Sequence, residues 1–304
     1  MNIDENSKIV IFGDDGFISN YLIRRLAKTN AKITLVDKHA NLQKDFSLMS
    51  SVGQISFNKM PNNEIEWGDI FFHATHVINL TDIFFETKKS TFEFINVELA
   101  RKIAYFAKLN DVDVLIHLSA ITCKSSKSKY NISKLSGEKA VLSEFPEAVI
   151  FRPSLIFGPE DRFLNFFIRI VKHSFFVPML VSGKTKFQPI YVDDVANAIE
   201  KCCYLAKSKI SGKIFEIGGE QQYSMKQLVK IIASLMQKKR IFVSMPLSLS
   251  LILVYIFKVA LYPLLTVEKV RFFKKNNVIT ASNAIDELNI APRNLNYELK
   301  RYIG

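Results

Sequence analysis

The feature that most constrains the fold is an apolar strand that runs directly into a glycine turn near the N-terminus. Lys8 to Phe12 has the pattern of a short buried parallel strand, and it ends at Gly13, with Gly16 three residues later. From Phe17 to Lys28, apolar residues recur at helical spacing. A strand, a glycine turn and a helix in this order predict the first repeat of a parallel sheet covered by helices.

The same alternation of strand and helix continues to about residue 155 and then loosens. Further strands are expected at 33–37, 55–57, 76–80, 113–118 and 148–151, with helices at 92–109 and 129–143. This predicts an α/β fold with a Rossmann-type doubly wound parallel sheet over residues 1–155. Turn signals such as Gly158-Pro159, helices at 194–206 and 225–237, and a strand at 213–217 predict a smaller C-terminal α/β lobe over 156–304, partly interleaved with the Rossmann domain around 187–206.

The glycine turn has two of the three glycines of a dinucleotide fingerprint. Gly13 and Gly16 occupy two of these positions and Ser19 the third, so a pyrophosphate is expected at the N-terminus of the following helix. Asp37 closes the second strand, where a carboxylate accepts hydrogen bonds from the adenosine ribose. That favours NAD, because a 2′-phosphate would face a like charge. Lys38, His39 and Lys44 offset this negative charge, so NADP stays open.

A second pair of residues points to the other end of a dinucleotide. Tyr130 and Lys134 stand four residues apart on a predicted helix and therefore share one face. An ammonium one turn away favours the ionised form of the phenol and can hold a ribose hydroxyl. Such a pair alone is ordinary helix surface. Downstream of a glycine turn it indicates nicotinamide chemistry.

A longer motif follows the strand expected at 148–151. Residues 157–165 read Phe-Gly-Pro-Glu-Asp-Arg-Phe-Leu-Asn and follow Arg152-Pro153. With these motifs the chain resembles the extended short-chain dehydrogenase/reductase superfamily, whose ordinary sugar epimerases carry only the Arg-Pro and Gly-Pro parts of this block. It is most similar to the atypical branch that includes the nucleotide-binding accessory subunit of respiratory complex I. The other matching segments are 13–18, 79–80, 96–97, 117–120, 137–141, 145–148 and 188–195.

The resemblance implies an intact cofactor site and an incomplete catalytic set. A catalytic Ser or Thr would normally follow Ser119 by two positions, and Ile121 occupies that place. Substitution by Thr122 or by a serine of the following loop (Ser125, Ser126, Ser128) is left open. Carried over by position, the catalytic residues are Tyr130 and Lys134, and the cofactor-binding residues are Gly13, Gly16, Phe17, Ile18, Asp37, Lys38, Leu80, Thr81, Ser119, Tyr130, Lys134, Pro153 and Leu155.

Three functions are compatible with the resemblance. The first is structural binding of NAD or NADP by a protein that supports a respiratory NADH dehydrogenase, with complex I subunits as partners. The second is an NAD(P)-dependent reductase or epimerase acting on a lipidic or quinone-like carbonyl, with Tyr130 as the acid. The third is a redox-sensing regulator with freely exchanging nucleotide.

Positive charge is concentrated near the C-terminus. From Lys226 to Lys275 there are ten basic residues and one acid, Glu268, and 247–265 is almost continuously apolar. Lys258 and Pro263 argue against a membrane span. Packing inside the C-terminal lobe and peripheral contact of 238–275 with an anionic membrane are both compatible with this pattern.

The remaining composition excludes several classes. No base-reading motif accompanies the net charge of +12, so nucleic acid is not an expected partner. The three cysteines and five histidines show no metal-ligand spacing, and no metal is expected. Residues 1–7 contain no apolar signal, which predicts a cytoplasmic location, including the inner face of the cell membrane.

Overall fold

The structure is a computed structural model that describes residues 3–13, 16–38, 50–83, 85–124, 128–179, 183–246, 248–249 and 275–303. The chain divides into two compact units. The first unit comprises 1–119, 133–152 and 195–215, and the second comprises 120–132, 153–194 and 216–304.

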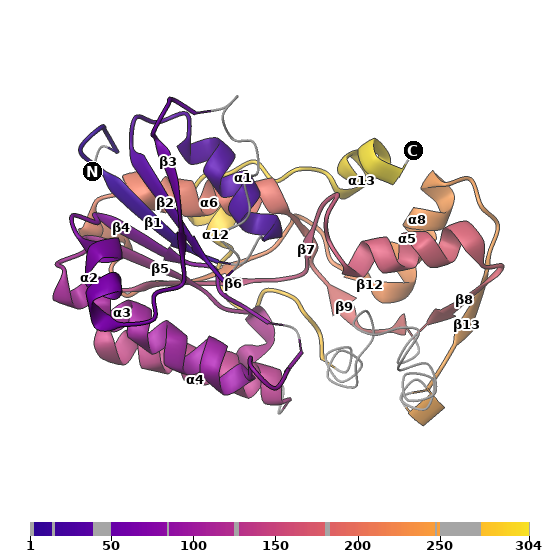
Figure 1. Cartoon of the computed structure of the whole chain (residues 1–304). Coiled ribbons are helices and arrows are strands. Elements are labelled where there is room, and N and C mark those ends of the chain that lie inside the picture. The colour runs from indigo at the N-terminus through magenta and orange to yellow at the C-terminus, as the bar shows by residue number, and fades with distance from the viewer. Residues whose placement is uncertain are drawn as a thin grey trace. The chain divides into compact units, whose positions relative to one another are not determined.

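The first unit is built on a seven-stranded sheet of order β11-β6-β5-β4-β1-β2-β3, with parallel pairing from β3 through to β6 (Figure 1). The predicted Rossmann-type doubly wound sheet is therefore confirmed. Its strands are β1 (Lys8–Phe12), β2 (Lys32–Asp37), β3 (Ile55–Lys59), β4 (His76–Asn79), β5 (Val114–Leu118), β6 (Val149–Pro153) and β11 (Ile214–Ile217). The helices between them are α1 (Phe17–Leu26), α2 (Glu64–Phe71), the π-helix η1 (Glu93–Glu98), α3 (Leu99–Leu109), α4 (Lys129–Glu144), α6 (Val192–Tyr204) and α7 (Lys207–Ile210).

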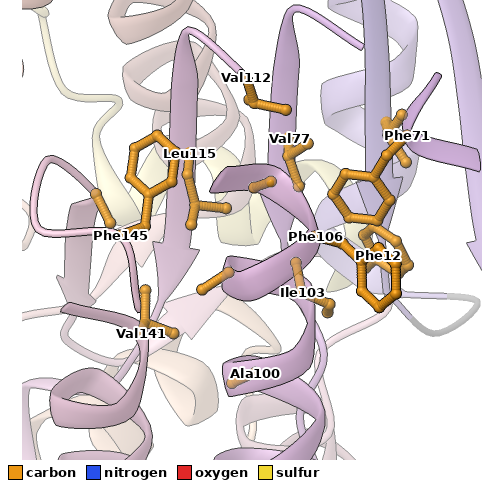
Figure 2. Packing of buried hydrophobic residues seen from close by; sticks show 14 of the residues in the cluster. Phe12, Phe71, Val77, Ala100, Ile103, Phe106, Val112, Leu115, Val141 and Phe145 are labelled. Carbon is orange, nitrogen blue, oxygen red and sulfur yellow. The ribbon is translucent and has the colours of Figure 1, made fainter. Parts of the chain in front are cut away.

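Helices cover both faces of this sheet. α2, α3 and α4 lie on one face and α1 and α6 on the other (Figure 1). On the first face, Phe12 stacks on Trp67 at a ring-centroid distance of 5.6 Å, and Trp67 stacks on Phe106 at 5.3 Å. Figure 2 shows Phe106 and Ile103 of α3 facing this side of the sheet. Because β1 and β5 are buried on both faces, their sequences are mostly apolar rather than alternating.

The second unit combines short strand pairs with helices α5 and α8. A capping box starts α8: the Ser224 hydroxyl accepts the Gln227 N–H, and the Gln227 side chain accepts the Ser224 N–H. Its elements are the 3-10 helix η2 (Ile121–Lys124), β7 (Ile156–Phe157), α5 (Phe163–His173), β8 (Phe176–Met179), β9 (Lys186–Phe187), β10 (Ile190–Tyr191), β12 (Tyr223–Ser224), α8 (Met225–Leu235), β13 (Ile241–Ser244), α12 (Ala284–Glu287) and α13 (Leu295–Ile303).

Two elements differ from the prediction made from periodicity. The expected helix at 92–109 is a π-helix, η1, followed by α3, because one extra residue per turn is accommodated at its N-terminal end. The strand expected within the C-terminal lobe, β11, joins β6 at the edge of the large sheet. Among the described residues, none of the helices has the length and apolarity that crossing a bilayer requires. Residues 250–274, which include most of the apolar segment 247–265, lie outside the described residues.

Candidate dinucleotide-binding site

The order of the strands places a topological switch point between β1 and β4. The chain proceeds from β1 to β2 and β3 on one side and from β4 to β5 and β6 on the other, so the direction of winding reverses between β1 and β4. Ligands of doubly wound sheets bind at the carboxyl ends of the strands at such a switch point. Gly13 follows β1 there and Leu80 follows β4, and the Leu80 N–H donates to the Phe12 carbonyl over 2.6 Å. A Cβ on residue 13 would lie 2.9 Å from the Leu80 Cβ, which explains the glycine.

The turn after Gly13 leads to an open helix N-terminus. Gly16 is the N-cap of α1 with extended backbone (φ −83°, ψ 144°), and no side chain of the described residues caps the helix. Phe17 and Ile18 form the first turn, which contains no acidic residue. Ser19, in the third glycine position, is buried and donates its hydroxyl to the Gly16 carbonyl over 2.8 Å. The N–H groups of this turn and the helix dipole make an anion site.

The end of β2 carries the residues predicted to face the adenosine. Asp37 is the last residue of the strand and is buried. Lys38 follows it and donates through Nζ to the Ser90 hydroxyl over 2.9 Å. The ammonium is therefore held by a loop hydroxyl, while the carboxylate stays at the strand end. His39 and Lys44, the other basic residues weighed for NADP, lie outside the described residues.

Lys134 is a buried ammonium held at the end of β5. Its side chain is 2% exposed. Nζ donates to the Leu118 carbonyl over 2.9 Å and lies 3.7 Å from Asp82 Oδ1. A buried charge requires such partners, since an unpaired one is costly. Asp82, two residues beyond Leu80, was not predicted from the sequence as a site residue. It could have been found from the rule that polar residues just after parallel strands share one edge of the sheet.

The polar side chains beside Lys134 fix one another's hydrogen positions. Asn79 Oδ1 accepts both the N–H and the hydroxyl of Thr81, at 3.0 and 2.7 Å, so its Nδ2 donates to His117 Nδ1 over 3.0 Å. Burial, and secondarily the charge of Lys134, lowers the pKa of His117 to about 3. His117 is therefore neutral, with its hydrogen on Nε2. Asn79 and His117 are further polar residues that prediction of the site missed.

Two buried polar atoms at this strand end have no hydrogen-bond partner within the described part of the chain. They are His117 Nε2 and Ser119 Oγ. Ser119 comes directly after β5, and its side chain is buried. An unsatisfied buried polar group costs about 1–3 kcal/mol. Together with the glycine at position 13, the free Ser119 hydroxyl fits a site completed by a polar ligand.

Two contacts hold α4 in place against its neighbours. Arg152 of β6 forms a two-pronged ion pair with Glu138 of α4, and both side chains are 3% exposed. At Gly137, an added Cβ would lie 2.0 Å from the Asn96 carbonyl oxygen of η1. This close approach is accompanied by a 2.9 Å hydrogen bond from Asn96 Nδ2 to the Ser133 hydroxyl. These contacts fix the helix segment that carries Lys134.

The position of the expected catalytic hydroxyl is apolar and buried. Ile121 lies in η2 and is buried, and the neighbouring Thr122 hydroxyl donates to Asn131 Oδ1 over 2.9 Å. Of the loop serines, Ser128 accepts the Asn131 N–H, whereas 125 and 126 lie outside the described residues. Thr122 therefore has a structural partner inside the second unit.

The remaining predicted residues belong to the second unit. Tyr130 is half-buried in the first turn of α4, one turn before Lys134. Pro153 ends β6, and the Leu155 carbonyl accepts the Ile190 N–H over 2.9 Å. Within the described residues, no cluster of histidine, cysteine and carboxylate side chains is arranged to hold a metal ion.

Comparison with known proteins identifies a family match and a match of the fold. Residues 9–218 match the NAD dependent epimerase/dehydratase family. A solved structure of UDP-glucuronic acid 4-epimerase from Bacillus cereus, in complex with UDP-glucuronic acid and NAD, superposes with a TM-score of 0.74 at 17% identity, covering 97% of this chain and 98% of that one.

Curated relatives share more sequence. The chain is 33% identical over 240 residues to NADH dehydrogenase (ubiquinone) 1 alpha subcomplex subunit 9, mitochondrial, of Arabidopsis thaliana, covering 78% of this chain and 60% of the relative. The Mus musculus protein of the same name is 34% identical over 252 residues, covering 79% and 63%. The chain thus spans less than two thirds of the length of these relatives. A protein named ceramide reductase, from Caulobacter vibrioides, is 24% identical over 206 residues, covering 67% and 63%. By fold, motifs and sequence, the chain belongs to the NAD dependent epimerase/dehydratase family.

Proposed function

We propose that this protein binds NAD(H) or NADP(H) as a structural ligand and supports a membrane-bound respiratory NADH dehydrogenase. The observation that carries the proposal is an asymmetry. The glycine turn, the buried Lys134 and the buried Ser119 hydroxyl, which has no partner among the described residues, support nucleotide binding, whereas buried Ile121 stands where the resemblance leads us to expect a catalytic hydroxyl. The relatives named as subunits of NADH dehydrogenase supply the partner, as a proposal for this chain.

Each residue then has a defined role in binding. The N–H groups after Gly16 bind the pyrophosphate, and Asp37 accepts hydrogen bonds from the adenosine ribose, which favours NAD over NADP. Lys134 and Tyr130 are the proposed ligands of the nicotinamide ribose, and the family resemblance assigns Ser119, Pro153 and Leu155 to its ring. When bound, the dinucleotide supplies a ring that can carry a hydride. Losing an oxyanion-type donor typically costs about 10²–10³ in rate, so hydride transfer is expected to be slow.

Nucleotide binding is tested by equilibrium dialysis of the full chain against NADH and NADPH. Lys134→Met removes a charged hydrogen-bond donor, which is worth about 1.5–3 kcal/mol, so affinity is expected to fall at least tenfold. Lys129→Met, an exposed residue of the same helix, is the matched control and leaves affinity unchanged. Equal affinity of both variants would refute the proposed site. A nucleotide that exchanges freely would favour the redox-sensing alternative.

The partner is tested on gently solubilised membranes of the source cell. Native-gel co-migration of the protein with NADH dehydrogenase activity is expected. Migration only as a small free species would refute the supporting role while leaving nucleotide binding untouched.

A reductase acting on a lipidic or quinone-like carbonyl is the second candidate. Sequence similarity to the protein named ceramide reductase favours it, and Tyr130 would donate the proton to the carbonyl oxygen. Under this alternative, Ile121→Ser restores a hydroxyl and raises turnover of a carbonyl panel about 10²–10³-fold. Under the structural proposal, Ile121→Ser gains no activity on the same carbonyl panel.

A further inference from the structure

One face of the small sheet formed by β8 and β13 is apolar and exposed. The two strands pair in parallel, with Ile241 beside Phe176 and Val243 beside Pro178 (Figure 1). Phe176, Ile241 and Val243 are 57%, 48% and 42% exposed, whereas the alternate residues of β8, Val177 and Met179, are fully buried. Because side chains alternate along a strand, the exposed residues share the outer face. We call Phe176, Pro178, Ile241 and Val243 the apolar strand face.

Basic residues border the apolar strand face. Exposed Lys172 and His173 end α5 just before β8, and exposed Lys238 and Lys239 lie in the turn between α8 and β13. Phe175, next to Phe176, is also exposed. The exposed residues that lead into both strands are therefore apolar or positively charged.

The sequence segments that contain the apolar strand face hold no acidic residue. Residues 163–187 and 221–249, which contain α5, β8, α8 and β13, hold nine basic residues and no acidic one. The second unit as a whole has 21 basic and 10 acidic residues, a net charge of +11, whereas the first unit has 20 and 19, a net charge of +1. Almost all of the excess positive charge belongs to the unit that carries the apolar strand face.

We propose that the apolar strand face and its basic border dock the protein on an anionic lipid surface. The inference deepens the proposed function, since a protein that supports a membrane-bound dehydrogenase works beside a bilayer. Exposed aromatic and aliphatic side chains enter the headgroup region, and basic residues nearby are attracted to anionic headgroups. The proposed contact consists of β8, β13 and the basic residues at 172, 238 and 239.

The charge distribution argues against a second copy as the occupant. In a two-fold symmetric dimer the same surface patch meets itself. The lysines at 172, 238 and 239 would then face one another across the interface, which disfavours association. An anionic bilayer offers the opposite charge over an extended surface.

The test is co-sedimentation of the full chain with vesicles of phosphatidylcholine alone or mixed with phosphatidylglycerol. Binding to the anionic vesicles at low salt is expected, with weakening at an ionic strength of about 0.15 M, where charges more than ~8 Å apart are screened. Absence of binding to anionic vesicles at low salt would overturn the proposal.

Two sets of variants locate the contact. Lys238→Gln with Lys239→Gln is expected to weaken binding roughly 30-fold, since each basic residue near an anionic surface contributes about 1 kcal/mol, or fivefold. The matched control is Lys88→Gln with Lys89→Gln. This exposed lysine pair belongs to the first unit and lies outside the proposed contact, so binding is expected to change less than about twofold. Equal effects of the two pairs would overturn the proposed location.

The apolar contribution is tested with Phe176→Thr, Ile241→Thr and Val243→Thr together, because threonine keeps strand propensity. Vesicle binding is expected to be lost while dialysis shows unchanged nucleotide affinity, which establishes that the variant folds. Should this variant instead abolish a concentration-dependent dimer that binds no vesicles, a second copy is the occupant and the lipid proposal is wrong. If the variant still binds vesicles, the apolar contribution is refuted. For the unsubstituted protein, vesicle binding without nucleotide binding would refute the nucleotide site alone.

Discussion

Replacement of Gly137 by alanine is expected to destabilise the protein even though alanine is the better helix former. The added Cβ would lie 2.0 Å from the Asn96 carbonyl oxygen, and real Cβ contacts essentially never fall below 3.0 Å. The two backbones must therefore separate by about 1 Å, and overpacking of a tight core costs about 1–3 kcal/mol. At a backbone–backbone contact we take the upper end, about 3 kcal/mol. Alanine returns up to about 1 kcal/mol of helix propensity, which leaves a net loss of about 2 kcal/mol.

Gly68 provides the matched control for Gly137. It lies inside α2, and an added Cβ there would meet no atom within 4 Å. Gly68→Ala is therefore expected to stabilise the protein by about 0.5–1 kcal/mol. The same substitution in two helices is thus expected to change the free energy of unfolding in opposite directions.

Urea unfolding of both variants measures the difference. The midpoint is expected to fall for Gly137→Ala and to rise for Gly68→Ala, with an unchanged slope. Because Lys134 lies less than one turn from Gly137, the first variant is also expected to bind dinucleotide more weakly. A Gly137→Ala protein as stable as Gly68→Ala would refute the argument from close packing.

Three further outcomes are expected. Arg152→Met leaves Glu138 buried without its partner and is expected to cost about 3–5 kcal/mol in chemical unfolding, whereas adding Glu138→Leu recovers much of the loss. Burial raises the pKa of Asp161 from 3.8 to about 6, so the folded state favours the protonated carboxyl group. The stability that this protonation contributes is present below pH 4 and is lost as the pH rises through about 6. Asp161→Asn should flatten the thermal stability profile between these pH values, and an unchanged profile would contradict this. Ser224→Ala removes the capping box of α8 and is expected to cost about 1 kcal/mol, whereas Ser234→Ala, at an exposed position of the same helix, should have little effect.

The parts of the fold that were predicted depend on local sequence. Lys8–Phe12 and the strand ending at Asp37 are buried on both faces, so their apolar runs identify them without knowledge of the rest of the chain. The helix predicted at 129–143 matches α4, which runs from Lys129 to Glu144. Positions at strand ends, such as Gly13 and Ser119, then follow from the rule that parallel strands present their carboxyl ends at one edge.

The parts that were missed depend on distant residues. The pairing of β11 with β6 joins residues more than 60 positions apart, and nothing in the composition of 213–217 indicates which sheet it enters. The contact of Asp82 with Lys134 and the pair of Arg152 with Glu138 need the register between β-strands and α4. The π-helix at Glu93–Glu98 differs from an α-helix by one residue in a turn, which periodicity does not resolve.

The place of β11 has a consequence for how the protein is made. On the ribosome, β6 emerges about 60 residues before the strand that covers its outer edge, and the whole stretch from β7 to α7 must be synthesised in between. During that time β6 is an open strand edge, the kind of surface through which nascent chains aggregate. A chain cut after residue 155 would keep that edge exposed permanently. The first unit is therefore not expected to be separable by simple truncation. A stable shortened form is expected to need residues 195–217 joined to β6 by a new connection.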